Sequence, residues 1–135
     1  MADMVITATE TLVIAGAEYE TAIAGEAVTA GMAVYKHTDG TLLKSVTTTA
    51  VTAACCGITL NGGAAGQPIR YVKQGPVDPG GTVVVGTVYA VTDTAGGLGD
   101  FAERATPDFV TIIGIGITAS QIMVNIDMSG IAIAA

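Results

Sequence analysis

The amino-acid sequence predicts an all-β protein, a small antiparallel β-barrel or β-sandwich with an extended N-terminal arm. Short β-like segments recur about every 8 to 12 residues, separated by clusters of Gly, Pro, Asn and Asp. An Asp-Gly pair between two apolar segments is typical of a β-hairpin. The last strand alternates apolar and polar residues, as a strand buried on one face does. With 135 residues, the chain has the length of one domain.

The N-terminal stretch differs from the rest of the chain in its charge. Residues 4–7 and 11–14 are short β-like runs. The first 26 residues contain five acids and no base, whereas the remaining 109 contain seven acids and five bases. The first stretch therefore carries −5 of the formal net charge of −7. We interpret residues 1–24 as an arm or edge element and residues 25–135 as a single β domain.

The first half of the β domain begins with a predicted hairpin. A strand within residues 27–35 ends near Lys36, Thr38-Asp39-Gly40 forms the turn, and residues 41–44 return. Residues 47–54 are ambiguous, because their threonines favour a strand and their alanines allow one helical turn. We expect a short helix or a loop there. Two further strands, residues 57–60 and 69–72, flank a glycine-rich turn.

The second half continues in the same pattern. Residues 75–81 are rich in turn formers and predict a loop, and residues 92–97 predict a turn. Residues 118–121 are a short link that predicts an antiparallel hairpin. The strands expected in this half are residues 82–89, 109–117 and 122–128. In the last of them, the positions that alternate towards the core are Ile122, Val124, Ile126 and Met128.

Three features that suggest chemistry have structural interpretations instead. Cys55 and Cys56 are adjacent, which disfavours a bridge between them and is not a zinc-ligand spacing. His37 lies beside the predicted hairpin turn without a marked nucleophile. Residues 114–119 match the letters G-x-G-x-x-A of a dinucleotide fingerprint, but a strand follows where a helix must begin. We therefore predict no catalytic residue, no cofactor and no metal site.

Composition also disfavours two classes of partner. Twelve acids against five bases do not provide the basic stripe that nucleic acid requires. The two long uncharged runs, residues 45–69 and 109–126, contain Thr, Gly and side-chain amides, which suit strands better than a membrane helix. The first residues lack a basic and then apolar leader, so no signal peptide is predicted. We expect a protein made in the cytoplasm that contacts neither nucleic acid nor membrane.

The order of several short motifs resembles one family. These motifs are Gly31-x-x-Val34-Tyr35 with Asp39-Gly40, the run Ala53-Ala54-Cys55-Cys56-Gly57-Ile58-Thr59-Leu60-Asn61-Gly62, Ala65-Gly66-Gln67-Pro68 with Gly75-Pro76-Val77, Gly86-x-x-Tyr89-x-Val91-Thr92 with Gly96-Gly97, and Val110-x-x-Ile113-Gly114. Together they resemble the small β-rich decoration, or cement, proteins and head-fibre-type proteins of tailed bacteriophages. The resemblance covers residues 25–130.

This resemblance implies a non-enzymatic virion protein on the outer capsid surface, made in the host cytoplasm. Such a protein binds the major capsid protein as a homotrimer, clamps neighbouring capsid subunits and needs no cofactor. Its N-terminal arm adds a strand to a capsid element, a contact built from main-chain hydrogen bonds. The residues expected to contact the capsid are Met4, Val5, Ile6, Glu10, Leu12, Val13, Ile14, Glu18 and Glu20.

Two alternatives remain open from the sequence. One is a receptor- or carbohydrate-binding β module of a phage fibre or tail, although such sites stack sugars on aromatic rings and this chain has six aromatic residues and no Trp. The other is a small β-barrel enzyme, which the single histidine and the lack of a paired-acid signature disfavour.

Overall fold

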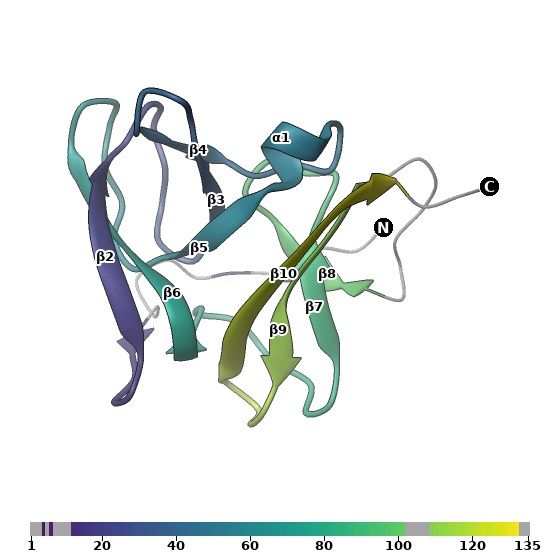
Figure 1. Cartoon of the computed structure of the whole chain (residues 1–135). Coiled ribbons are helices and arrows are strands. Elements are labelled where there is room, and N and C mark those ends of the chain that lie inside the picture. The colour runs from purple at the N-terminus through teal and green to yellow at the C-terminus, as the bar shows by residue number, and fades with distance from the viewer. Residues whose placement is uncertain (1–3, 5, 7–11, 102–108, 133–135) are drawn as a thin grey trace.

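The computed structural model describes residues 4, 6, 12–101 and 109–132, which form ten strands and one short helix (Figure 1). The paired strands are all antiparallel, which confirms the predicted all-β class. In chain order the elements are β1 (Leu12–Val13), β2 (Glu18–Ile23), β3 (Ala33–Lys36), β4 (Leu42–Lys44), α1 (Ala50–Ala53), β5 (Cys55–Thr59), β6 (Pro68–Asp78), β7 (Val88–Val91), β8 (Leu98–Asp100), β9 (Phe109–Gly116) and β10 (Ile122–Ala132).

Strand β6 joins the two halves of the sheet. The hydrogen-bonded order is β4-β3-β5-β6-β10-β9-β7-β8. Strands β5 and β10 pair with successive parts of one edge of β6, and β1 and β2 pair with its opposite edge. Along that other edge, β2 pairs with residues 68–74 and β1 with residues 77–78. The sheet curls into a half-barrel, and an isolated bridge between Ala24 and Leu42 brings the end of β2 to β4 (Figure 1).

The predicted loop at residues 75–81 is wrong for residues 75–78, because β6 continues to Asp78. A turn-forming composition did not end the strand, since a new partner, β10, takes over where β5 stops pairing. Gly75 allows this, because its φ is +100° and a Cβ there would lie 2.8 Å from the Cα of Ala17. A residue with a side chain is disfavoured on both grounds.

The predicted strand at residues 82–89 is also wrong over most of its length, because β7 begins only at Val88. The preceding residues form a loop that is hydrogen-bonded to the end of β9 and its turn. The Val83 N–H donates to the Ala119 carbonyl at 2.9 Å, and the Gly86 N–H donates to the Gly116 carbonyl at 2.8 Å. Strand β8 has no counterpart among the predicted strands.

Local signals correctly predicted the β3–β4 hairpin. In its turn the Asp39 carboxylate accepts hydrogen bonds from the Thr41 N–H at 3.0 Å and the Thr41 hydroxyl at 2.6 Å. Gly40 has φ +86°, a conformation that favours glycine. The ambiguous segment 47–54 contains the helix α1, whose start is capped by reciprocal hydrogen bonds between Thr49 and Thr52.

The last hairpin also follows its sequence pattern. Strands β9 and β10 pair antiparallel across the predicted link. Ile122 and Val124 are fully buried and Asn125 is exposed, as the alternation requires.

Two apolar clusters fill the interior. The smaller cluster lies with β2, β3, β4 and the start of β6, and consists of Ala24, Val28, Val34, Leu42, Ile69 and Tyr71. The larger cluster joins the two halves and consists of Ala33, Cys55, Ile58, Val72, Val77, Val83, Tyr89, Val91, Leu98, Ile113, Ile122 and Val124. The larger cluster is built mainly from β-branched residues, which pack well on a pleated surface, and half of the smaller cluster is.

A test of close backbone packing uses Gly114 in β9. A Cβ there would overlap the Met123 carbonyl of β10, so we expect Gly114→Ala to cost ~3 kcal/mol of unfolding free energy. Gly40→Ala is the matched control, since Gly40 has open space around it and only its positive φ opposes a side chain, at about 1 kcal/mol. Urea unfolding monitored by circular dichroism measures both. Equal losses in the two variants would contradict this account of β9–β10 packing.

Candidate protein-interaction surfaces

The residues expected to contact a capsid fall into separate places. Glu18 and Glu20 are exposed on β2, and Ile14 is half-buried in the turn before it. Met4 and Ile6 are half-buried and pack against the larger apolar cluster. Leu12 and Val13 form β1 on β6. Val5, Glu10 and the side chains of Leu12 and Val13 lie outside the described part of the chain.

Met4 lies along the edge strand β8. Its N–H donates to the Leu98 carbonyl at 2.7 Å. Met4 and Ile6 also line a hollow of about 230 Å³ whose other walls are residues 29–32 and 94–98. This volume is below the ~300–1,000 Å³ of typical ligand pockets. The hollow formed by the described residues is therefore smaller than a typical small-molecule site.

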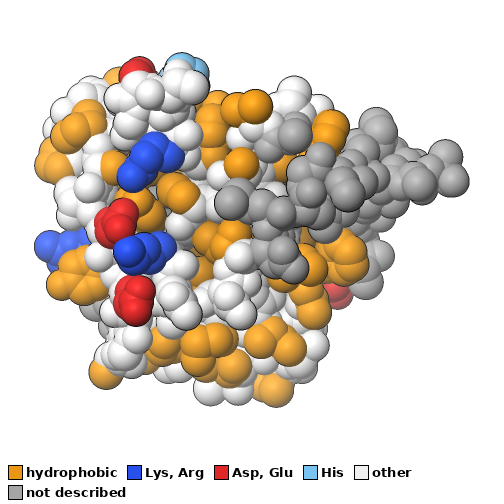
Figure 2. Space-filling model, in the orientation of Figure 1, with side chains coloured by type: hydrophobic (Ala, Val, Ile, Leu, Met, Phe, Trp, Pro, Cys, Tyr) orange, Lys and Arg blue, Asp and Glu red, His pale blue; other side chains and the backbone are white. Residues whose placement is uncertain are grey.

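A stripe of alternating charge crosses β2, β6 and β3. The Glu20 carboxylate accepts hydrogen bonds from the Tyr71 hydroxyl at 2.9 Å and from Lys73 Nζ at 2.6 Å. Lys36 Nζ lies 5.9 Å from the centre of the Tyr71 ring, and Glu18 lies near enough to Lys73 to interact electrostatically. Figure 2 shows basic and acidic side chains alternating in a column on this face.

The contacts within the stripe shift the pKa values of Glu20, Lys73 and Tyr71. The hydrogen bond from Lys73, followed by that from Tyr71, lowers the pKa of Glu20 below its usual value. The same contact with Glu20 raises the pKa of Lys73. Burial, followed by the hydrogen bond to Glu20, raises the pKa of Tyr71. Glu20 is thus an anion and Tyr71 a neutral donor at neutral pH, which is a structural arrangement and not an activated nucleophile.

Strand β2 also has an open edge. Within the residues that the structure describes, β2 pairs with no strand other than β6. Tyr19 is 51% exposed, and the Arg70 guanidinium lies 5.1 Å from the centre of its ring. Ile23 is exposed further along the strand. An edge strand of this kind presents main-chain donors and acceptors that another strand can pair with.

An apolar surface lies at the other end of β6. Pro76, Met123, Ile115 and Val88 are direct cross-strand neighbours on β6, β10, β9 and β7, so their side chains share one face of the sheet. The loop before β7 lies beside the end of β9, because the Gly86 N–H donates to the Gly116 carbonyl at 2.8 Å and the Gly116 N–H donates to the Thr87 carbonyl at 2.9 Å. We call the following seven residues the apolar platform: Pro76, Val84, Val85, Val88, Ile115, Ile117 and Met123.

The platform is well exposed for an apolar surface. Val84 and Val85 are 60% and 64% exposed, and Ile115 and Ile117 are 43% and 37% exposed. Figure 2 shows hydrophobic side chains gathered at the lower edge of the molecule, where β9 ends in Figure 1. Sequence reasoning missed this surface. The uncharged segments 83–88 and 109–126 were visible, but only the register of four strands aligns their outward residues.

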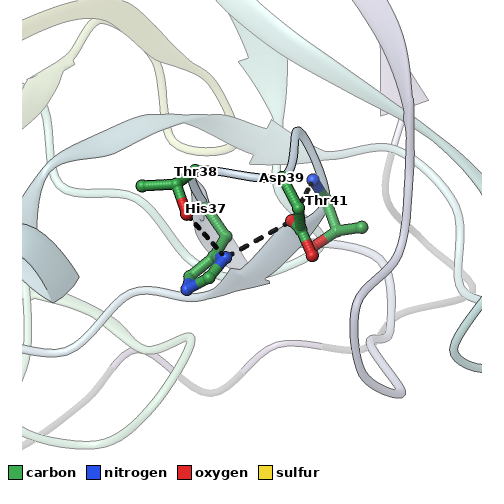
Figure 3. Close-up of polar contacts among 4 residues, drawn as sticks. All are labelled: His37, Thr38, Asp39 and Thr41. Carbon is green, nitrogen blue, oxygen red and sulfur yellow. Dashed lines mark hydrogen bonds and ion pairs between the residues drawn. The ribbon is translucent and has the colours of Figure 1, made fainter.

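His37 lies exposed beside the hairpin turn, at the place that the sequence predicted. Figure 3 shows its ring beside the β3–β4 turn, with Nδ1 3.3 Å from the Asp39 carboxylate and 3.4 Å from the Thr38 hydroxyl. The hydrogen bonds from Thr41 are the main reason that the pKa of Asp39 is lowered. The side chains of His37 and Asp39 are both exposed, and the hydrogen bonds from Thr41 to Asp39 hold the turn in place.

The cysteines and the fingerprint glycines are structural as well. Cys55 and Cys56 are free thiols, and burial raises the pKa of Cys55 to about 12, which makes it a poor nucleophile. Gly114 and Gly116 lie in β9, where Cβ atoms would overlap the carbonyls of Met123 and Val84. Their function is to let neighbouring backbones approach, which confirms the structural interpretation.

The tyrosines contribute mainly to the interior. Tyr35, Tyr71 and Tyr89 are buried, and only Tyr19 of the four is exposed. Most of the tyrosine rings are therefore unavailable for stacking on a sugar.

The remaining observations concern metal binding, membrane-spanning helices and relatives of the chain. Among the described residues, no three His, Cys, Asp or Glu side chains gather in a way that could hold a metal ion. None of the described helical segments has the length and hydropathy to cross a membrane. Neither protein-family models nor curated proteins yield a match to this chain.

The charged stripe predicts a pH-dependent contribution to stability. Because the folded pKa of Glu20 lies below its usual 4.5, its contribution is present above that value and disappears as the pH falls through the lowered pKa. We expect Glu20→Gln to be less stable than the parent chain at pH 7 and to match it at the acidic end. Urea unfolding between pH 3 and 8 measures this. Glu18→Gln, an exposed acid outside the Glu20 hydrogen bonds, is the control, and a pH-independent difference for Glu20→Gln would refute the assignment.

Proposed function

We propose that this chain is a non-enzymatic structural protein of a tailed-bacteriophage particle. It binds the outer capsid surface as a homotrimer and holds neighbouring major capsid subunits together. The motif order that resembles decoration and head-fibre-type proteins supports this proposal. The small all-β body, with two surfaces suited to protein contacts, supports it as well.

The observation that carries the proposal is the open edge of β2. This strand combines an edge that pairs with no other strand of the described residues with the acids Glu18 and Glu20 and the exposed side chains of Tyr19 and Ile23. A capsid element that adds as a strand gains main-chain hydrogen bonds whatever its sequence. Glu20 is already paired with Lys73 at 2.6 Å, so Glu18 is the acid of β2 that adds selectivity, because it favours a basic partner during encounter and helps to fix its register.

The closed lattice of a capsid makes a modest contact sufficient. Each bound trimer offers several copies of the β2 edge to a surface with repeated sites. Once one copy is bound, the others act at a high effective concentration. A β2 edge that binds weakly by itself therefore yields firm attachment and links neighbouring subunits.

The test is co-sedimentation with expanded, undecorated capsids of the phage that encodes the chain. We expect binding at micromolar concentration, and we expect Glu18→Lys to weaken it about tenfold, because the acid of β2 that is not hydrogen-bonded to Lys73 is replaced by a base. Asp93→Lys is the matched control, since it makes the same charge change at an exposed turn residue away from β2. Absence of binding by the parent chain would refute the function, and equal weakening by both variants would refute the role of β2.

A further inference from the structure

We infer that the apolar platform is the surface through which copies of this chain bind one another. The inference rests on the proposed function only for the expectation that copies associate. It assigns that association to Pro76, Val84, Val85, Val88, Ile115, Ile117 and Met123, and leaves the β2 edge free for a different partner.

The first argument is the size and continuity of the platform. It crosses four neighbouring strands without interruption, and the adjoining loop extends it. The seven side chains expose on the order of 400 Å² of apolar surface, roughly half of the ~800 Å² that each partner contributes to a standard interface. The platform therefore has the size of an interface core, and surrounding polar residues supply the remainder.

The second argument is charge. Each copy carries a formal charge of −7, so two copies repel each other over most orientations. The segments that form the platform, residues 83–88 and 109–126 together with residues 74–77, contain no charged residue. The acids nearest to these segments on β6 and β2 are Asp78, whose carboxylate accepts a hydrogen bond from the Gly80 N–H at 2.9 Å, and Glu18, the cross-strand neighbour of Gln74. The seven platform residues themselves are uncharged, so two acidic copies can meet there with their acids at the border of the contact.

The third argument is the composition of the border. Beside the apolar row, Gln74 and Asn125 are exposed cross-strand neighbours on β6 and β10. The β9–β10 turn adds the exposed residues Thr118 and Ser120. An apolar centre inside an uncharged polar border is the arrangement found in contacts between identical subunits, whose centres are depleted of charge. The charged stripe on β2, in contrast, favours a partner of different charge.

The test compares two valines of equal exposure. Val85 is 64% exposed on the platform, and Val51 is 66% exposed on α1, which lies at the opposite end of the molecule from the β9–β10 turn (Figure 1). We expect the parent chain to be oligomeric by light scattering after size-exclusion chromatography at tens of micromolar. Val85→Glu should raise the dissociation constant at least about tenfold, because it buries an unpaired acid in the contact. Val51→Glu should leave the mass unchanged.

A second platform variant, Ile117→Lys, guards against a local folding defect in Val85→Glu, and circular dichroism checks each variant. A monomeric parent chain would overturn the inference. Platform variants that keep the parent mass would also overturn it, as would a loss of association in Val51→Glu equal to that in Val85→Glu.

Failure of this inference is distinguishable from failure of the proposed function. A monomeric parent chain that still co-sediments with capsids would overturn the platform contact and leave capsid binding intact. An oligomer that Val85→Glu dissociates, but that does not bind capsids, would support the platform contact and refute the proposed function.

Discussion

The rest of the structure depends on β6, which has hydrogen-bonded partner strands along both of its edges. This one strand pairs with β2 and β1 on one edge and with β5 and then β10 on the other. The exchange from β5 to β10 occurs beside Gly75, where a positive φ and the close approach of Ala17 leave no room for a side chain. Because β6 belongs to both halves, the two apolar clusters are parts of one folded unit.

The two halves of β6 also contribute to two different kinds of surface. Its first half carries Arg70 and Lys73, which interact with Tyr19 and Glu20 of the edge strand β2. Its second half presents Pro76 to a row of apolar neighbours on β10, β9 and β7. A single chain can therefore present a charged strand edge to one partner and an uncharged face to another, without the two contacts competing for the same residues.

This division explains the unusual composition of the chain. Half of the residues are hydrophobic and only 13% are charged. Much of the apolar content fills two clusters of β-branched and small residues, and glycines such as Gly114 let the strands that enclose them approach closely. Much of the exposed apolar surface forms the platform, and Tyr19, Ile23 and Val51 lie outside it. A chain with so little charge remains suited to water when the platform is covered by another protein surface.

The sequence by itself determined the all-β class, the Asp39-Gly40 hairpin, the last hairpin and the placement of His37 beside a turn and of Gly114 in a strand, because each depends on neighbours close along the chain. Only the tertiary structure decided that β6 continues through Gly75 and Pro76, and that residues 82–87 form a loop against the end of β9. It also placed Met4 against β8 and aligned the platform across four strands. These features depend on hydrogen-bond partners distant in sequence, and no local pattern specifies which strands will meet or in what register.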